Sequence, residues 1–407
     1  MRINNAIFNV VILIVLTAFF LGAYLLENLG VQYVSEGGTP LLKIHVYSYL
    51  IMATVFICLL KFGIKGYVSA LGEFKQAWLR AFGCIVFVIL YGLYKQGMSG
   101  MAYLVDFIFT PLLFVPILLS LTNKQKHFVI TLLAYLILFN ACLAIVEFSF
   151  SYRLIAVEFT SFSHFRSTAL LTHPLNNALI TASLTMLLMD KTRLPSIVYF
   201  FIVFIALFAF GGRGSTAIFL FAFALLTLPT IHTFFIKGVV MSKLRFALYQ
   251  AGLCVAAFAA VIALTATPIG DRILSKMYVD NSATARFKVF DFLERMSSNE
   301  FLFGASQSSR ENIKFFSDIN VIENYLVGWI ANFGLLGLLL LVAGVFLLPI
   351  TMARRMDSKA LLSMFILFFA SITNNALSTK TITVLLMLTV ITCLVQQVKL
   401  FSPKEAR

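Results

Sequence analysis

Residues 195–232 read PSIVYFFIVFIALFAFGGRGSTAIFLFAFALLTLPTIH, two apolar runs that enclose an arginine among three glycines. As one straight helix, this stretch would be about 57 Å long, nearly twice the roughly 30 Å thickness of the apolar part of a bilayer. The run therefore has to break, and glycine permits a sharp change of direction. The sequence predicts two antiparallel membrane-spanning helices with a tight turn at Gly211–Gly214, which places Arg213 at one membrane face.

The apolar character of this stretch extends over the whole chain. Of the 407 residues, 60% are hydrophobic and 12% are charged, and 43 are phenylalanine. Soluble domains carry roughly twice this charged fraction, so we predict an all-α polytopic membrane protein. The net charge of +14 would suggest a nucleic-acid partner for a soluble protein. In a membrane protein, basic cytoplasmic loops explain it, so we expect membrane lipids and no nucleic acid as partners.

A helix that crosses a bilayer needs roughly 20 apolar residues, and about twelve segments of this chain meet that requirement. They lie near residues 6–26, 44–60, 80–96, 101–121, 128–148, 174–190, 195–210, 214–232, 246–268, 324–350, 360–378 and 381–398. The first is too long for a cleavable signal peptide, so we expect it to stay as an anchor. The chain then divides into spans 1–9 (residues 1–268), a large loop (269–323) and spans 10–12 (324–407).

The distribution of basic residues predicts the orientation. If both termini are cytoplasmic, the cytoplasmic loops and ends collect eighteen basic and four acidic residues, whereas the short outer loops hold six basic residues. Basic residues concentrate in the cytoplasmic loops of membrane proteins, which favours this orientation. The large loop then lies on the outer face with seven basic and seven acidic residues before Glu323. A loop of this length in a compact protein is usually functional.

Arg213 has two alternative roles. In one, it anchors the turn among lipid headgroups, as arginines at helix ends commonly do. In the other, Gly211, Gly212 and Gly214 let an anionic group approach the backbone, where the guanidinium and the amides of the following helix, from Ser215 on, bind it. A guanidinium beside a helix N-terminus is typical of phosphate-binding sites. The three glycines favour this second role.

The large loop contains an amphipathic segment, ATARFKVFDFLERM (residues 283–296). On a helical wheel it has a broad apolar face, with Lys288, Asp291 and Arg295 opposite. Arg286 lies instead on the apolar side, which should pack on the membrane domain. A buried arginine needs an anionic partner, so Arg286 is a candidate anion-binding residue. The alternative is a first-turn side chain that extends to water.

Further polar candidates stand at the starts of two predicted spans. Glu323 and Asn324 lie where the large loop enters the tenth span, and a carboxylate there suits a general base. The alternative is an acid that complements the helix dipole. Arg166 and His173 lie in the other long outer segment, before Pro174 starts the sixth span. A lone histidine there is more often structural than catalytic, so these two are weaker candidates for substrate binding.

Several motifs are missing from the sequence. It has no Walker A, GxSxG or HExxH motif, and no outward-facing Asp-x-Asp pair that would hold a metal. All five cysteines lie in apolar runs, which indicates neither a zinc site nor a disulfide framework. We therefore expect no metal and no cofactor. The acids within spans, Asp106 and Glu147, lie near the outer ends, whereas ion-coupled transporters usually keep charges near the midplane.

Three features together resemble the O-antigen ligase and O-antigen polymerase superfamily of bacterial polysaccharide assembly. They are the Gly212–Gly214 motif opening a span, Arg286 leading an amphipathic segment, and the Asn324 helix start followed by FGLLG at residues 333–337. The twelve-span layout with one large loop before the tenth span is similar too. The stretch HPLNNA (residues 173–178) resembles polymerases more than ligases.

The resemblance implies a GT-C-like, metal-independent, inverting glycosyltransferase of the bacterial inner membrane, with a periplasmic active site. Its substrate would be an undecaprenyl-pyrophosphate-linked oligosaccharide, and a chain-length regulator is a further candidate partner. Arg213 and Arg286 match the two phosphate-binding arginines of the family. Its ligases carry histidine-asparagine where this chain has Glu323-Asn324, so the resemblance favours a polymerase with Glu323 as the base. A ligase and a lipid-linked oligosaccharide flippase are the alternatives.

Overall fold

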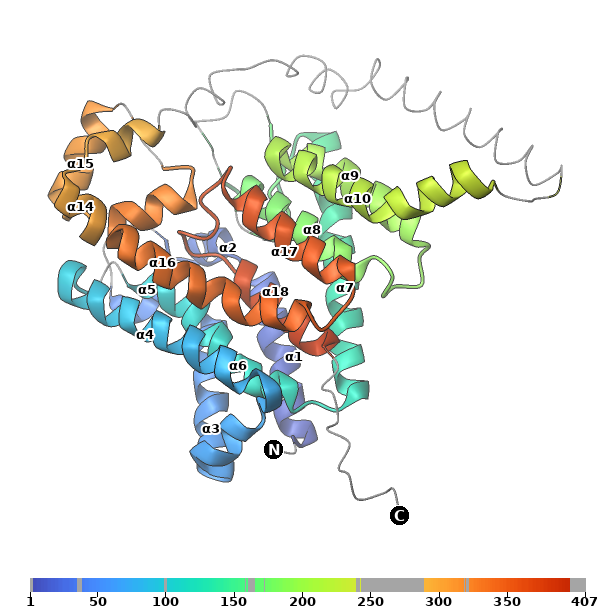
Figure 1. Cartoon of the computed structure of the whole chain (residues 1–407), viewed down its shortest axis with the longest axis horizontal. Helices are drawn as coiled ribbons and strands as arrows, with labels where there is room; N and C mark the ends of the chain where they lie inside the picture. The colour runs from blue at the N-terminus through green and yellow to red at the C-terminus, as the bar shows by residue number, and fades with distance from the viewer. Residues whose placement is uncertain are drawn as a thin grey trace.

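The computed structural model describes residues 3–34, 39–98, 101–157, 159, 165–171, 173–238, 242, 289–317, 319 and 322–395. Within these residues the chain is helical and forms no strand (Figure 1). The elements are α1 (Asn5–Phe20), α2 (Ala23–Asn28), η1 (Pro40–Lys43), α3 (Val46–Ser69), η2 (Gly72–Phe74), α4 (Lys75–Gln96), α5 (Ala102–Leu104), η3 (Val105–Phe109), α6 (Thr110–Leu119), α7 (Asn123–Phe150), α8 (Pro174–Leu188), α9 (Ser196–Phe210), α10 (Arg213–Lys237), α14 (Ser298–Phe303), α15 (Gln307–Phe316), α16 (Tyr325–Ala353), α17 (Ser358–Ser371) and α18 (Thr383–Leu394).

The structure confirms an all-α protein with several membrane-crossing helices. Six stretches of the described chain are long and apolar enough to cross a bilayer: α3, η2 with α4, α5 through α6, α7, α10 and α16. Five more apolar helices, α1, α8, α9, α17 and α18, are shorter. The predicted span 246–268 lies outside the described residues. The count of twelve spans and the GT-C-like arrangement therefore stay predictions.

Helix α8 forms the centre of the bundle. All of its residues, from Pro174 to Leu188, are buried. Helices α7, α9, α10, α17 and α18 pack around it. Because α8 has no exposed side, the residues at its start are held by neighbours from several parts of the chain.

The predicted turn between the two apolar runs is present. Helix α9 ends at Phe210, Gly211 adopts a left-handed conformation (φ 73°), and α10 begins at Arg213. The backbone N–H of Gly211 donates to the carbonyl of Phe208 at 2.9 Å. A Cβ on Gly212 would lie 2.4 Å from the Cβ of Ala178 in α8, so the turn packs tightly on the central helix. The second helix begins at Arg213, one residue before the predicted span 214–232.

A second break occurs inside α16 at Gly334, where φ is 72°. The chain after α14 fits against this break: a Cβ on Gly334 would lie 2.2 Å from the carbonyl oxygen of Leu302. The N–H of Ala305 donates to the carbonyl of Ala331 at 2.9 Å. These contacts fix α14 onto α16, and Figure 1 shows α14 and α15 together beside the start of α16. The close approach at Gly334 is thus made to the large loop.

The described part of the predicted amphipathic segment packs as expected except at one position. Val289 and Phe292 are buried with Met296 in a small apolar cluster that includes Ile313 of α15. Phe290, which the helical wheel places on the apolar face, is 48% exposed. Residues 283–288, including Arg286, lie outside the described residues.

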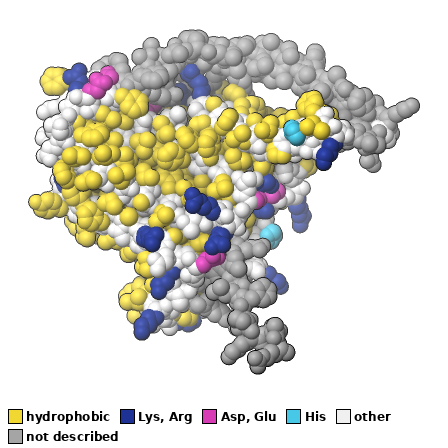
Figure 2. Space-filling model, in the orientation of Figure 1, with side chains coloured by type: hydrophobic (Ala, Val, Ile, Leu, Met, Phe, Trp, Pro, Cys, Tyr) yellow, Lys and Arg dark blue, Asp and Glu magenta, His cyan; other side chains and the backbone are white. Residues whose placement is uncertain are grey.

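Polar and charged residues lie at the two ends of the bundle. We call the end where α8, α10 and α16 begin the site face, and the end where α7, α9 and α17 begin the opposite face. The loop between α17 and α18 (residues 372–382) lies on the site face. Figure 2 shows a broad band of hydrophobic side chains across the molecule, with basic side chains gathered below it. This pattern is typical of a protein that spans a bilayer.

Candidate functional site

The segment before α8 is irregular yet buried. Arg166 is 9% exposed, and Ser167, Thr168 and Ala169 are at most 1% exposed. The buried carboxylate of Glu147 in α7 accepts from the N–H groups of Thr168 and Ala169, both at 2.9 Å. Non-helical backbone at this depth is tolerated only when its polar groups are satisfied by protein. Glu147, an acid that the sequence places near an outer helix end, therefore holds the segment that carries Arg166.

Arg166 and His173 lie close enough to influence each other's charge. Burial, together with the charge of Arg166, lowers the pKa of His173 to about 4. The imidazole is therefore neutral at neutral pH, and its Nδ1 accepts from the N–H of Leu175 at 3.4 Å, which caps α8. The capping role fits the structural interpretation of His173. Arg166 remains a cation beside the start of α8.

The turn that carries Arg213 borders the same region. The N–H of Ser167 donates to the carbonyl of Ala209 at 3.0 Å, which links the buried segment to the end of α9. A Cβ on Gly214 would lie 2.4 Å from Oγ1 of Thr373 in the α17–α18 loop. Arg213 itself is half-buried. The structure thus gathers the Arg213 turn, the Arg166 segment and the α17–α18 loop around the start of α8.

A polar pocket of about 230 Å³ lies further along the same loop. Its lining comes from α15, the start of α16 and the α17–α18 loop: Arg310, Lys314, Ile322, Gly328, Ala331, Asn332, Asn375, Ser378 and Thr379. We call it the site-face pocket. Arg310 is oriented by a hydrogen bond from Nη1 to the carbonyl of Ala305 at 2.9 Å. Burial lowers the pKa of Arg310, and an anion bound in the pocket would relieve this cost.

Glu323 and Asn324 connect the large loop to the start of α16. Glu323 directly follows Ile322, one of the lining residues, and is half-buried. Asn324 is 5% exposed, and its Oδ1 accepts from the N–H groups of Leu326 (2.9 Å) and Val327 (3.3 Å). The oxygen of Asn324 is thereby occupied in capping α16. Two carboxylates are next in sequence to lining residues of the pocket: Glu323 follows Ile322, and Glu311 follows Arg310.

The α17–α18 loop is anchored at its far end by a buried carboxylate. Asp106 accepts from the hydroxyls of Tyr33 (2.8 Å) and Ser48 (2.6 Å) and from the N–H of His45 (3.0 Å). Lys380 in the loop donates to the carbonyl of Tyr33 at 2.5 Å and lies 4.4 Å from the centre of its ring. Asp106 therefore has a structural role: it binds Tyr33, and Tyr33 binds Lys380 of the loop that carries the pocket residues.

Several buried polar groups near these helix starts make no hydrogen bond to the described residues. They are Oγ1 of Thr168, Oδ1 of Asn176, the hydroxyl of Tyr325, Nε1 of Trp329 and Oγ1 of Thr383. Buried polar atoms are usually paired, so a group of unpaired ones indicates a place where a polar ligand or water binds. None of these atoms belongs to a residue that lines the site-face pocket.

Arg286, the second predicted phosphate-binding arginine, lies outside the described residues. Arg213 is described but does not line the site-face pocket. The turn that carries Arg213 and the pocket both border the α17–α18 loop. Sequence reasoning missed Arg310 and Lys314, because it counted the charges of the large loop as balanced. Their spacing was the available signal: residues four apart in a helix lie on one face, so α15 presents both cations together.

The arrangement can bind an anion with cations and neutral donors and can offer a carboxylate beside it. The described residues contain no cluster of three or more histidine, cysteine or acidic side chains of the kind that holds a metal ion. Comparison with known proteins finds no matching family model, no matching curated protein and no matching solved structure. The functional interpretation therefore depends on the site geometry and on the sequence resemblance.

Proposed function

We propose that this protein is a glycosyltransferase that polymerises a polysaccharide from lipid-linked repeat units. The substrate would be an oligosaccharide on undecaprenyl pyrophosphate, used at the periplasmic face of the bacterial inner membrane. The observation that carries the proposal is the site-face pocket, which Arg310 and Lys314 line together with Ile322, the residue before Glu323. A diphosphate requires cations, and a sugar hydroxyl that attacks requires a base.

The chemistry needs only groups that this region supplies. The acceptor hydroxyl oxygen attacks the anomeric carbon of the donor, its proton passes to the carboxylate of Glu323, and the bond from the anomeric carbon to pyrophosphate breaks. Attack from the face opposite the leaving group inverts the configuration. The departing diphosphate gains negative charge, which Arg310 and Lys314 stabilise by hydrogen bonding.

Arg213 has a supporting place in this proposal. Its turn contacts the loop that also lines the pocket, so we place its guanidinium and the first amides of α10 near the diphosphate as part of the proposal. The resemblance assigns a similar role to Arg286. Arg166, His173 and Asn324 remain weaker candidates, and the contacts of His173 and Asn324 support structural capping.

The proposed orientation agrees with the distribution of charge. The opposite face carries Lys191, Arg193, Arg354, Arg355 and Lys359 close together at the ends of α8, α16 and α17. Such clustering is typical of a cytoplasmic face. The site face would then be periplasmic and both termini cytoplasmic, and a chain-length regulator would be a partner in the membrane.

The test is incubation of the purified protein with a lipid-linked repeat unit in the absence of metal, with products separated by size. The intact protein should produce a ladder. Arg213→Ala, Arg310→Ala and Glu323→Gln should each reduce elongation by a factor of 100 or more, since each removes a group that acts on the transition state. Arg80→Ala, an exposed arginine at the start of α4 on the opposite face, is the control and should leave the ladder unchanged.

The products also separate the alternatives. Two results together would indicate a ligase. Single repeat units would stay on the carrier after incubation with active protein, and finished glycan would be transferred to lipid A-core when that acceptor is added. Movement of lipid-linked substrate across vesicles without any new glycosidic bond would indicate a flippase. A ladder of normal length from both Arg310→Ala and Glu323→Gln would refute the site.

A further inference from the structure

The opposite face contains a crevice that the proposed function does not use. Its volume is about 720 Å³, and it lies between the start of α7, the connection from α8 to α9 and the end of α18. Its lining residues are His127, Ile130, Thr131, Tyr135, Asp190, Lys191, Thr192, Arg193 and Leu394. An adjoining pocket of about 250 Å³ shares Asp190, Lys191 and Leu394 and adds Leu187, Arg355, Met356, Asp357 and Lys359. We call the two together the opposite-face crevice.

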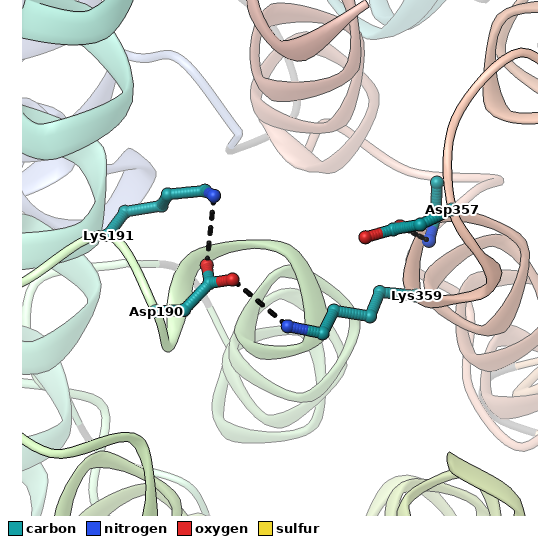
Figure 3. A network of polar contacts seen from close by, with 5 residues as sticks. Asp190, Lys191, Asp357 and Lys359 are labelled. Atoms are coloured by element: carbon teal, nitrogen blue, oxygen red, sulfur yellow. Dashed lines mark hydrogen bonds and ion pairs between the residues drawn. The ribbon is translucent and has the colours of Figure 1, made fainter.

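Two lysines in this crevice are fixed around one carboxylate. Asp190 accepts from Nζ of Lys359 at 3.0 Å and forms an ion pair with Nζ of Lys191 at 3.2 Å. Figure 3 shows the two lysines approaching Asp190 from opposite sides. Asp357 is also committed, since its Oδ1 accepts from the N–H of Ala360 and caps α17. The acids of the crevice are thus used internally, and the cations still outnumber them.

Three other polar side chains of the crevice are not paired with any described residue. Arg193 is exposed and has no carboxylate within ion-pair distance among the described residues. Its backbone is fixed, because its N–H donates to the hydroxyl of Tyr135 at 3.2 Å. The hydroxyls of Thr131 and Thr192 are buried and make no hydrogen bond to the described part of the chain. Arg193, Thr131 and Thr192 therefore line the crevice, and their side chains have no acceptor oxygen among the described residues.

The rest of the lining is apolar and continues onto the membrane-facing surface. Ile130 and Leu394 line the crevice, and Tyr135 is 41% exposed. On the same helix, Phe128 and Phe139 are each 52% exposed. A ligand that suits both parts has an anionic, oxygen-rich head and hydrocarbon chains. Basic pockets between helices at the cytoplasmic side of membrane proteins bind lipid headgroups in this way.

We infer that the opposite-face crevice binds the phosphate headgroup of an anionic phospholipid. Arg193 and Lys191 would contact the phosphate, Thr192 and Thr131 would donate hydrogen bonds to it, and Ile130 and Leu394 would pack against the first carbons of the acyl chains. The site does not depend on the proposed function, because it lies at the other end of the bundle and shares no residue with the site-face pocket.

The experiment uses the whole protein in nanodiscs made of phosphatidylcholine, with or without one-third phosphatidylglycerol. Native mass spectrometry counts the lipids that remain bound after the disc is removed. The intact protein should retain phosphatidylglycerol over phosphatidylcholine, and Arg193→Ala should reduce this preference about fivefold, the effect expected for one cation at a headgroup. Arg193→Ala removes an exposed side chain, so the fold should be kept.

Three controls decide the outcome. Arg80→Ala makes the same charge change on an exposed residue of the same face and should leave lipid retention unchanged. Thr192→Val should reduce retention while the net charge stays constant. Equal retention in Arg193→Ala, Arg80→Ala and the intact protein would overturn the inference. Millimolar inorganic phosphate is also added to the intact protein in pure phosphatidylcholine discs. If it raises the Tm as much as phosphatidylglycerol does, the lipid assignment is overturned.

Discussion

The roles of several single residues follow from the groups that contact them. Glu147 and Asp106, the two acids at outer helix ends, each accept several hydrogen bonds from backbone or hydroxyl groups. Their buried charge is therefore compensated, as stability requires. His173 is neutral for a related reason, because it lies partly buried beside the cation of Arg166. Such residues hold the site face together, whereas Arg310 and Lys314 line the site-face pocket.

The low pKa of His173 predicts acid sensitivity. The folded state has a pKa of about 4 at this residue, against an ordinary value of 6.5. Between these values the unfolded state binds more protons, so stability should be present above pH 6.5 and fall as the pH drops toward 4.

The measurement is the Tm of the protein and of His173→Asn between pH 7 and pH 4.5. Asparagine keeps an oxygen that can cap α8 but does not titrate in this range. The Tm of the intact protein should therefore fall more steeply with acid than the Tm of the variant. Parallel curves would show that His173 carries no part of the acid sensitivity.

At the scale of elements, the helices differ in how far the sequence predicts them. The break between α9 and α10 follows from length alone, since an unbroken helix would exceed the bilayer, and the glycines mark its position. The break in α16 at Gly334 depends on Leu302 and Gly304 from the large loop. That contact is non-local, so residues 325–353 alone indicate only a long apolar helix. The site-face pocket was missed for the same reason, because its lining combines three separated segments.

The junction at Gly334 gives a prediction about stability. A side chain there would need a positive φ and would meet the carbonyl of Leu302 at 2.2 Å. Gly334→Ala should therefore reduce the free energy of unfolding by about 1–3 kcal/mol. Gly83→Ala is a matched control in α4, where an added Cβ meets no atom within 4 Å. It should be neutral or slightly stabilising, since alanine favours a helix.

Unfolding by titration with sodium dodecyl sulfate compares the two variants with the intact protein. Limited proteolysis adds a local readout, because loosening of α14 from α16 should expose residues 298–306 to protease in Gly334→Ala only. Equal stability of the two alanine variants would contradict the tight junction described between Gly334 and Leu302.

At the scale of the whole molecule, the bundle has two polar ends joined by apolar helices. Composition and run lengths were sufficient to predict the all-α membrane class, since a chain this apolar needs lipid to cover its surface. The sequence also placed Arg213, Glu323 and His173 at helix ends, where the structure finds them. The sequence did not predict which helix ends border the α17–α18 loop, because that depends on how the helices pack around α8.

The orientation of the two ends is testable by cysteine labelling. Ser308 in α15 is exposed at the site face, and Lys124 in α7 is exposed at the opposite face. In a background without native cysteines, Ser308→Cys should react with a membrane-impermeant maleimide on intact spheroplasts. Lys124→Cys should react only after permeabilisation. The reverse pattern would place the site-face pocket in the cytoplasm and exclude a periplasmic active site.

The burial of α8 on every side bears on how a substrate reaches the site-face pocket. Since no residue from Pro174 to Leu188 is exposed, this helix lines no aqueous passage through the middle of the bundle. If the proposed lipid-linked substrate enters from the side of the bundle, its isoprenoid tail stays in the surrounding hydrocarbon and only its head moves to the pocket. Access would then be governed by lateral diffusion in one leaflet.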